Sequence, residues 1–296
     1  MKENQASRTA EMMALFRALE SARPAGTRLF NDQLAVRFLR PWMRWGVRLS
    51  YYRPVHAGLC RFIDRHAPGV RPSAVARTRF IDDALRHALS GGVEQVVLLG
   101  AGYDCRGWRI EGMNRARIFE VDCRGTQLFK RLRLKEAAPP LPVQEVFVEA
   151  DFMRQALGDA LAAAGFDRNR KAFFIWEGVT NYLDERSVDS TLRFIGSCAE
   201  GSGIVFTYIH RGLLDGSAAF SLSPNVARML DRSGEPWTFG FDPKELPSWL
   251  RARRIELLQD LGAIEYGALV MGATESQMKG YEFYRVAVAT VADRRA

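Results

Sequence analysis

The sequence has few cysteines, few lysines and no long apolar run. Its four cysteines, Cys60, Cys105, Cys123 and Cys198, form no CxxC pair and have no pair of histidines nearby. This scatter argues against a zinc site and against a disulfide framework, so no metal is expected. No run of 18 apolar residues occurs, so we expect no membrane-spanning helix and no membrane partner.

The amino-terminal segment also lacks the features of a secretion signal. It reads MKENQASRTAEMMALFRALE, which carries acids early and has no basic start, apolar stretch or small-residue cleavage site. Together with the scattered cysteines, this composition predicts a protein of the reducing cytoplasm.

Basic residues outnumber acidic ones by 42 to 34, which gives a formal net charge of +8. Such a balance suits a nucleic acid or an acidic ligand. Only six of the basic residues are lysines, however, and an arginine bias also arises from codon composition. We interpret the mild clusters at Arg37–Arg48, Arg124–Lys135 and Arg251–Arg254 as solvated surface, which does not favour a nucleic-acid partner.

The hydrophobic pattern changes near residue 90. Before it, apolar residues recur at three- and four-residue spacing in Glu11–Ser21, Asp32–Phe38 and Ser73–Ala88, which predicts helices. After it, short apolar runs alternate with helical stretches, as in a parallel sheet with crossover helices. We therefore expect a helical cap over residues 1–90 and a binding core over residues 91–296, within one compact domain.

Seven extended segments are predicted in the core. They are Gln95–Leu99, Arg117–Val121, Val143–Val148, Lys171–Trp176, Gly203–Ile209, Ile255–Gln259 and Glu282–Val291. A helix is predicted over Pro243–Arg253, with Asp242 as its N-cap and Pro243 at its first position. The pattern indicates an α/β protein with a seven-stranded, mostly parallel, doubly wound sheet. Ligands of such sheets bind at the carboxyl ends of the strands, so binding motifs should follow strands.

A glycine turn follows the first predicted strand, in VVLLGAGYDCRGWRI (Val96–Ile110). Gly100 and Gly102 flank Ala101, and glycines here permit a positive φ and close approach of a ligand. The third glycine of the GxGxxG dinucleotide motif would fall at Cys105, so the turn favours a ligand without a diphosphate. A turn needed only for packing is the alternative.

Two acids end the second predicted strand, in IFEVDC (Ile118–Cys123). A carboxylate there can accept hydrogen bonds from both ribose hydroxyls of a nucleoside. Strand alternation puts Glu120 and Asp122 on the same side, so the pattern does not separate them, although Asp122 lies further out and is preferred. A surface acid at a strand end is the alternative.

Motifs along most of the chain resemble the leucine carboxyl methyltransferase family, which includes bacterial O-methyltransferases associated with polyketide pathways. In order, they are RALESARP (17–24), LFNDQLAVRF (29–38), ARTRFIDDAL (76–85), LGAGYDCRGWR (99–109), FEVDCRGTQLFK (119–130), EADF (149–152), WEGVTNYL (176–183) and GEPWTFGFDPKELPSWL (234–250). The resemblance implies a class I, Rossmann-like fold with S-adenosyl-L-methionine as cofactor. It also implies methyl transfer to a carboxylate or hydroxyl oxygen of a small molecule.

The resemblance implies a set of cofactor-binding residues. They are Arg77 for the methionine carboxylate, Gly100, Ala101 and Gly102 beneath the methionine part, Asp122 with Cys123 at the ribose, Asp151 and Phe152 at the adenine, and Glu177 at the amino group and sulfonium. A fixed guanidinium fork suits a carboxylate. The alternatives are a helix-surface arginine for Arg77 and a helix N-cap for Asp151. The chain departs from the family at Cys105, often threonine, at Arg124, often proline, and at Arg253 or Arg254, where a glycine is typical.

Methyl transfer from a sulfonium is an in-line displacement, in which the protein aligns the reactants and excludes water. A carboxylate acceptor is already ionised and needs no base, whereas a hydroxyl acceptor would need one. Tyr182 and His210 are the candidate catalytic residues, and an ordinary loop position is the alternative for His210.

The helical cap and the insertion 211–241 are expected to cover the acceptor. They hold aromatic residues that suit an aromatic or acidic small molecule, or equally a buried core: Phe30, Trp42, Trp45, Tyr51, Tyr52, Phe220 and Trp237. Two rival functions stay open. One is a nicotinamide-dependent oxidoreductase, which Cys105 and the EADF segment disfavour, and the other is a non-catalytic cofactor- or nucleic-acid-binding protein. The oligomeric state is not predicted.

Overall fold

The computed structural model describes residues 8–137, 144–153, 155–220 and 236–293. A seven-stranded sheet crosses the molecule in the order β3-β2-β1-β4-β5-β7-β6. Its strands are β1 (Gln95–Leu99), β2 (Arg117–Asp122), β3 (Glu145–Glu149), β4 (Ala172–Trp176), β5 (Gly203–Ile209), β6 (Ile255–Gly262) and β7 (Tyr284–Val291). Only the pairs made by β7 are antiparallel among the described strands. The predicted α/β fold with a mostly parallel, doubly wound sheet is confirmed.

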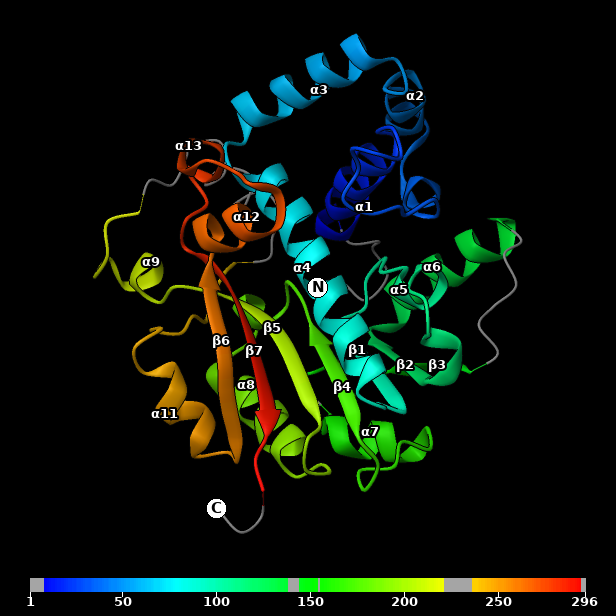
Figure 1. Cartoon of the computed structure of the whole chain (residues 1–296). Coiled ribbons are helices and arrows are strands. Elements are labelled where there is room, and N and C mark those ends of the chain that lie inside the picture. Colours follow the sequence, from blue (N-terminus) through cyan, green and yellow to red (C-terminus); the bar gives the residue numbers. More distant parts are fainter. Residues whose placement is uncertain (1–7, 138–143, 154, 221–235, 294–296) are drawn as a thin grey trace.

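Helices cover both faces of this sheet (Figure 1). One face carries α4 (Val70–Ser90), α12 (Ala263–Met271) and α13 (Glu275–Met278), and the other carries α7 (Leu157–Ala163), α8 (Glu185–Gly196) and α11 (Leu246–Arg251). The central strand β1 shows why two cores form. Val97 and Leu99 enter one core and Val96 and Leu98 the other, because successive side chains of a strand point to opposite faces.

The remaining amino-terminal helices lie beyond the carboxyl ends of the parallel strands (Figure 1). They are α1 (Arg8–Ser21), the 3-10 helix η1 (Ala35–Phe38), α2 (Pro41–Leu49) and α3 (Arg53–His66). Their buried side chains share a cluster with Tyr103 and Cys105, which follow the glycine turn. By contrast, α4 packs along the sheet through Phe80, Ile81 and Leu85. The first 90 residues therefore contain both an overlying part and a helix of the sheet's own core.

Two predicted helices were wrong at their starts. Asp32 is not helical, because its buried carboxylate accepts a hydrogen bond from Ala35 N at 3.0 Å and pairs with Arg17 at 2.9 Å. The helix predicted from Pro243 begins at Leu246, so Asp242 is not its N-cap. The Asp242 carboxylate instead accepts a hydrogen bond from Lys244 N at 2.9 Å in the preceding turn.

Two basic positions also differ from the solvated surface that was expected. Lys130 on α6 (Arg124–Ala137) is only 1% exposed. Arg254 has φ 61°, and it is the one non-glycine residue with positive φ in the described ranges. Its guanidinium donates to the carbonyls of Gly196 at 3.0 Å and Ala292 at 3.1 Å, which supports this left-handed conformation. Glycine adopts a positive φ readily, so Arg254 is the position at which this chain departs from the glycine that is typical of the family.

No helix within the described ranges is long and apolar enough to cross a bilayer. The four cysteines are unpaired. The described residues contain no group of three or more His, Cys, Asp or Glu side chains that could hold a metal ion. Residue 143 of one predicted strand and residues 221–235 of the predicted insertion lie outside the described residues.

Candidate functional site

The predicted binding segments meet where the strand order reverses. β1 pairs with β2 on one side and with β4 on the other. Gly100 follows β1, Asp122 ends β2 and Glu177 follows β4. Because the carboxyl ends of parallel strands share one edge of the sheet, these three residues lie at the switch point where α/β sheets bind ligands.

The two glycines of the turn are needed for different reasons. Both have positive φ, 66° at Gly100 and 51° at Gly102. A Cβ on Gly100 would lie 2.4 Å from Val179 Cγ2, whereas a Cβ on Gly102 would lie 3.5 Å from Ala10 Cβ, an ordinary contact. Gly100 therefore lets the segment after β4 approach the turn, and Gly102 is required by its backbone conformation.

Gly100→Ala is expected to destabilise the fold by about 1–3 kcal/mol more than Gly92→Ala, because it adds overpacking to the cost of a positive φ. Gly92 is the matched control: its φ is 81°, and a Cβ at this position would have no atom within 4 Å. Urea denaturation measures both variants. Val179→Ala should recover part of the difference in a double-mutant cycle. Equal losses at Gly100 and Gly92, without coupling to Val179, would contradict the close approach.

The structure separates the two acids of β2. Glu120 is fully buried, and both of its carboxylate oxygens lie 2.6 Å from Lys130 Nζ. Asp122 instead accepts hydrogen bonds from Gly102 N at 2.6 Å and Cys123 N at 2.7 Å. Burial raises the pKa of Asp122 despite these bonds. Glu120 is thus an internal ion-pair partner, and Asp122 is the acid placed beside the glycine turn.

Arg77 and Glu177 form an ion pair across the site. Arg77 Nε lies 2.8 Å from Glu177 Oε1, and the guanidinium lies 4.6 Å from the centre of the Tyr284 ring. Arg77 is 3% exposed, so the alternative of a helix-surface arginine is wrong. Burial opposes ionisation of Glu177, but Arg106 and Arg77 outweigh it and lower the pKa of Glu177. The two side chains present opposite fixed charges at neutral pH.

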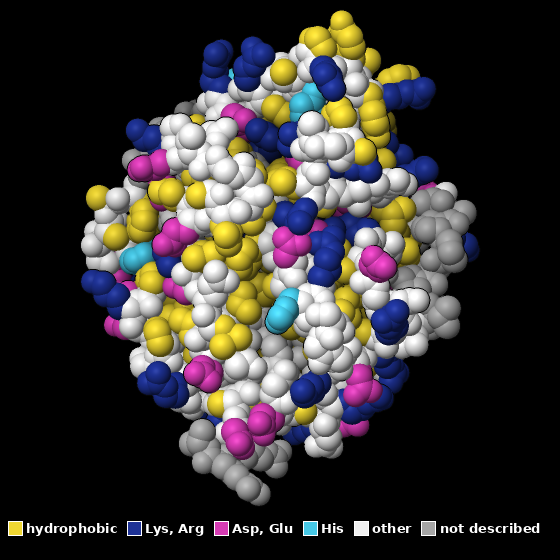
Figure 2. Space-filling view, viewed as in Figure 1, with side chains coloured by type: hydrophobic (Ala, Val, Ile, Leu, Met, Phe, Trp, Pro, Cys, Tyr) yellow, Lys and Arg dark blue, Asp and Glu magenta, His cyan; other side chains and the backbone are white. Residues whose placement is uncertain are grey.

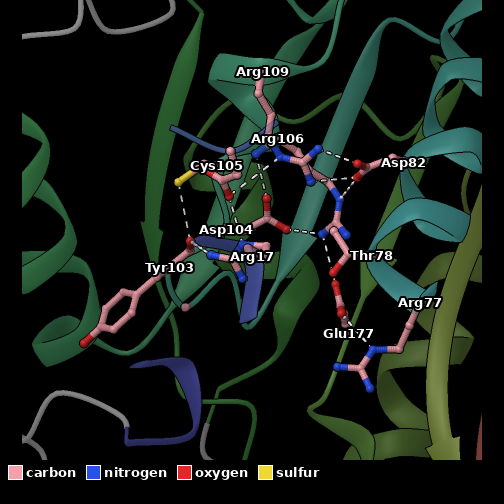
Figure 3. A network of polar contacts seen from close by, with 12 residues as sticks. Arg17, Arg77, Thr78, Asp82, Tyr103, Asp104, Cys105, Arg106, Arg109 and Glu177 are labelled. Carbon is pink, nitrogen blue, oxygen red and sulfur yellow. Dashed lines mark hydrogen bonds and ion pairs between the residues drawn. The ribbon is translucent and has the colours of Figure 1, made fainter. Parts of the chain in front are cut away.

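A buried arginine that the sequence analysis did not single out supports this pair. Arg106 Nη1 lies 3.0 Å from Glu177 Oε2 and also contacts Asp104, while Arg106 Nε lies 2.8 Å from Asp82 Oδ1. Figure 3 shows Glu177 between Arg77 and Arg106. Burial opposes ionisation of Asp104, but Arg106 and other arginines lower the pKa of Asp104 to about 2.

The same network reaches the amino-terminal helix α1. Arg109 Nη2 lies 2.8 Å from Asp82 Oδ1, and Arg109 Nε lies 3.8 Å from Asp32 Oδ2. Asp32 also pairs with Arg17, whose Nη2 donates to the Tyr103 carbonyl at 2.5 Å. The acids and arginines come from segments far apart in sequence. The only sequence signal was an unusual number of arginines, which does not identify partners.

The predicted adenine pair follows β3. The Asp151 carboxylate accepts a hydrogen bond from Met153 N at 2.9 Å, and Phe152 packs near Trp176 with ring centres 6.5 Å apart. The next described helix, α7, begins at Leu157 with Ala156 as its N-cap. The alternative of a helix N-cap at Asp151 is therefore wrong.

The two candidate catalytic residues lie after β4 and β5. Tyr182 is half-buried in η3 (Thr180–Tyr182). His210 Nδ1 accepts a hydrogen bond from Gly212 N at 2.9 Å, and its ring lies 5.1 Å from that of Phe220. Burial lowers the pKa of His210. A neutral ring with an accepting Nδ1 carries its proton on Nε2, so the remaining nitrogen of His210 is a donor in this geometry.

The aromatic residues expected near the acceptor divide into two groups. Phe30 is buried. Phe220 and Trp237 are half-buried and pack against Phe283, with ring centres 6.1 and 5.6 Å apart. The other group is exposed by 62–69%, so the buried-core alternative is wrong for its members: Trp42, Trp45, Tyr51 and Tyr52.

The sequence is similar to those of known proteins. Residues 10–196 match the model of a family described as leucine carboxyl methyltransferase. A relative in Frankia alni is 36% identical over 208 residues, which cover 70% of each chain. A relative in Streptomyces coelicolor is 36% identical over 222 residues, which cover 75% of each chain. Both relatives are named as candidate S-adenosyl-L-methionine-dependent methyltransferases.

Two solved structures share the fold. A DUF574 family protein from Streptomyces avermitilis superposes with a TM-score of 0.61 at 13% identity, covering 96% of this chain and 97% of that one. A protein from Thermobifida fusca, described as a candidate methyltransferase, gives a TM-score of 0.56 at 16% identity and covers 95% of both chains. At these identities the likeness shows the fold alone.

Proposed function

Because this chain belongs to the leucine carboxyl methyltransferase family, we propose that it methylates a carboxylate or hydroxyl oxygen of a small molecule. The matches to the family and to its named relatives confirm the predicted family, enzyme class and cofactor. The protein is an S-adenosyl-L-methionine-dependent methyltransferase. The nicotinamide-dependent oxidoreductase alternative is set aside by this membership. The acceptor, the site residues and the cytoplasmic location belong to the proposal.

The Arg77–Glu177 pair is the observation that carries the proposed site. The amino-acid end of S-adenosyl-L-methionine bears a carboxylate, an ammonium and a sulfonium. Arg77 offers a buried cation for the carboxylate, and Glu177, held ionised by Arg106, offers an anion for the two cationic groups. The cation of Arg77 and the anion of Glu177, 2.8 Å apart, therefore match in sign the carboxylate and the cationic groups of the ligand.

The rest of the cofactor site extends along the strand ends. Gly100, Ala101 and Gly102 form a turn without bulky side chains, which suits contact with the methionine part. Asp122, beside Cys123, is assigned to the ribose hydroxyls. Two further residues, Asp151 and Phe152, are assigned to the adenine. When bound, the cofactor supplies an electrophilic methyl group, and the residues of this chain hold and orient it and exclude water.

The geometry of His210 favours an acceptor that is ionised before it binds. The Nδ1 lone pair is engaged by Gly212 N, and the neutral ring then carries a proton on Nε2. Such a ring can donate a hydrogen bond to a carboxylate, but it cannot remove a proton from a hydroxyl without changing tautomer. A carboxylate acceptor needs neither step. We therefore place carboxylic acids before phenols among the acceptors, with Tyr182 and His210 in positioning roles.

His210→Ala is expected to lower kcat by less than about tenfold, whereas loss of a true general base costs about a hundredfold or more. Steady-state kinetics with the best acceptor measures this. For a carboxylate acceptor, kcat/KM should also be flat as pH rises above the lowered pKa of His210. A rise of kcat/KM through that pKa, abolished in the variant, would instead assign His210 as the base of a hydroxyl methyltransferase.

The proposed reaction is tested by supplying methyl-labelled cofactor with panels of carboxylic acids and phenols and analysing the products by mass spectrometry. A methyl ester supports the carboxylate assignment and a methyl ether the hydroxyl assignment. We further propose that the helices of residues 1–90 and the insertion 211–241 border the acceptor. Cofactor binding without methylation of any oxygen acceptor, but with methylation of nitrogen or carbon compounds, would overturn the proposal.

A further inference from the structure

Exposed apolar side chains are concentrated in one short part of the chain. Thirteen large hydrophobic side chains are exposed in the described residues, and seven of them lie between positions 42 and 62: Trp42, Trp45, Leu49, Tyr51, Tyr52, Val55 and Phe62, which are 38–69% exposed. They belong to α2, α3 and the two residues that precede α3. A concentration of this kind on a soluble fold marks an interaction surface.

The apolar residues form stripes that point away from the protein. On α2, Trp42, Trp45 and Leu49 have the i, i+3, i+7 spacing of one helix face, while Val47 on another face is 3% exposed. On α3, Val55 and Phe62 are likewise seven residues apart, and Cys60 faces the interior. Each helix therefore has two apolar faces, of which only one is used by the fold.

Arginines flank these stripes almost without acids. The segment Pro41–His66, here called the basic arm, contains five arginines and a single carboxylate, Asp64, which pairs with Arg71 at 2.6 Å. None of the five arginines forms an ion pair with a carboxylate among the described residues. Arg44 donates to the carbonyls of Leu39 and Arg37, and the other four are Arg48, Arg53, Arg61 and Arg65. Figure 2 shows yellow apolar and dark blue basic side chains side by side on the protruding top of the molecule, where Figure 1 places α2 and α3.

We propose that the basic arm binds the surface of an anionic lipid bilayer, with the stripes of α2 and α3 in the interfacial region. Helices that lie in a membrane interface typically have tryptophan, tyrosine, leucine and phenylalanine on one face, with arginine beside them. The unpaired positive charge complements anionic headgroups. This inference is independent of the proposed acceptor. It also revises the expectation of no membrane partner, which considered only spanning segments.

Other occupants fit the arm less well. A second copy of the chain would bring two sets of unpaired arginines together, and like charges across an interface oppose association. Single-stranded nucleic acid would match the arginines and aromatic rings, but not the exposed Leu49 and Val55, which offer no stacking surface. A bilayer surface accepts the aromatic, aliphatic and basic side chains together.

The test is co-sedimentation of the full chain with vesicles of phosphatidylglycerol and phosphatidylcholine, compared with phosphatidylcholine alone. Binding should require the anionic lipid, weaken with salt and shift tryptophan emission to shorter wavelength. A triple variant W42S/W45S/F62S and a quadruple variant R48Q/R53Q/R61Q/R65Q should each weaken binding by about tenfold or more. The control L258S/L269S removes two side chains exposed by 62% and 65% on β6 and α12 and should bind like the wild type.

Circular dichroism and thermal melts establish that each variant is folded. The proposal is overturned if the folded wild type does not bind anionic vesicles, or if the control variant L258S/L269S weakens binding as much as the arm variants do. It is also overturned if the arm variants abolish a concentration-dependent dimer in ultracentrifugation or binding to single-stranded RNA while vesicle binding persists. Those results would assign the arm to a second copy or to nucleic acid.

Discussion

Replacing Arg106 by methionine is expected to lower the free energy of unfolding by about 3–5 kcal/mol. The guanidinium is 2% exposed and contacts carboxylates of three residues, Asp82, Asp104 and Glu177. Methionine fills much of the same space without charge, so the dominant loss is electrostatic. Asp104, which has no other short ion pair in the described residues, would be left as a largely buried carboxylate, 14% exposed, without its main partner.

Guanidinium chloride denaturation measures this loss, and Arg86→Met is its matched control. Arg86 lies on the outer face of α4, and its pair with Asp83 at 2.8 Å joins two side chains that are 42% and 47% exposed. A surface pair of this kind contributes about 1 kcal/mol or less. If the two substitutions cost the same, the buried network does not stabilise the fold in the way proposed.

The loss caused by Arg106→Met should also depend on pH. Burial opposes ionisation of Asp104, but Arg106 and weaker contributions from neighbouring cations lower the pKa of Asp104 from its ordinary 3.8 to about 2. The pair with Arg106 therefore stabilises the folded state fully only above the unfolded value. Its contribution disappears as pH falls through the folded pKa. The difference between wild type and variant should therefore be constant from pH 7 to about 5 and should shrink below about 4. A difference that grows in acid would contradict the assigned charge states.

Asp122→Ala is expected to weaken binding of S-adenosylhomocysteine by about 1.5–3 kcal/mol, which is roughly a ten- to hundredfold rise in Kd. The reason is the loss of a carboxylate that can accept hydrogen bonds from ribose hydroxyls. Isothermal titration calorimetry measures the change. Affinity in the wild type should also fall in acid as Asp122 becomes protonated, since burial raises the pKa of this group.

Asp167→Ala is the control for this variant. Its carboxylate also accepts a backbone hydrogen bond, from Asn169 N at 2.9 Å, but it lies before β4, at the opposite edge of the sheet from the site. It should bind S-adenosylhomocysteine like the wild type. Unchanged affinity in folded Asp122→Ala would show that another acid binds the ribose, and the proposed role of Asp122 would be wrong.

Local patterns in the sequence were enough to predict the strands of the sheet and the glycine turn. The bounds of β1 and β5 were predicted to the residue, because short buried runs of Val, Ile, Leu and Phe suit only a strand covered on both faces. The same patterns placed Gly100, Asp122 and Glu177 after strands. Parallel strand geometry then brings such positions to one edge without further information.

Pairing between distant charges was decided only by the tertiary structure. Arg77 and Glu177 are 100 residues apart, and Arg106 and Asp82 are 24 apart. A charged residue in a sequence can be solvated or paired, and which of the two applies depends on burial. Glu120 and Asp122 have the same strand phase, and their tertiary contacts distinguish them: Glu120 pairs with Lys130, whereas Asp122 accepts a hydrogen bond from Gly102 N.

The exposure of the amino-terminal helices was likewise invisible in the sequence. Apolar periodicity tells that a helix has an apolar face, but it does not tell what covers that face. Trp42 and Trp45 carry the same pattern as core residues and are nevertheless 65% and 62% exposed. By itself, the sequence determined the fold class, the family and the edge of the sheet that we propose for the cofactor. The tertiary structure decided which charges neutralise one another and which apolar side chains remain open to a partner, because both depend on contacts between segments far apart in the chain.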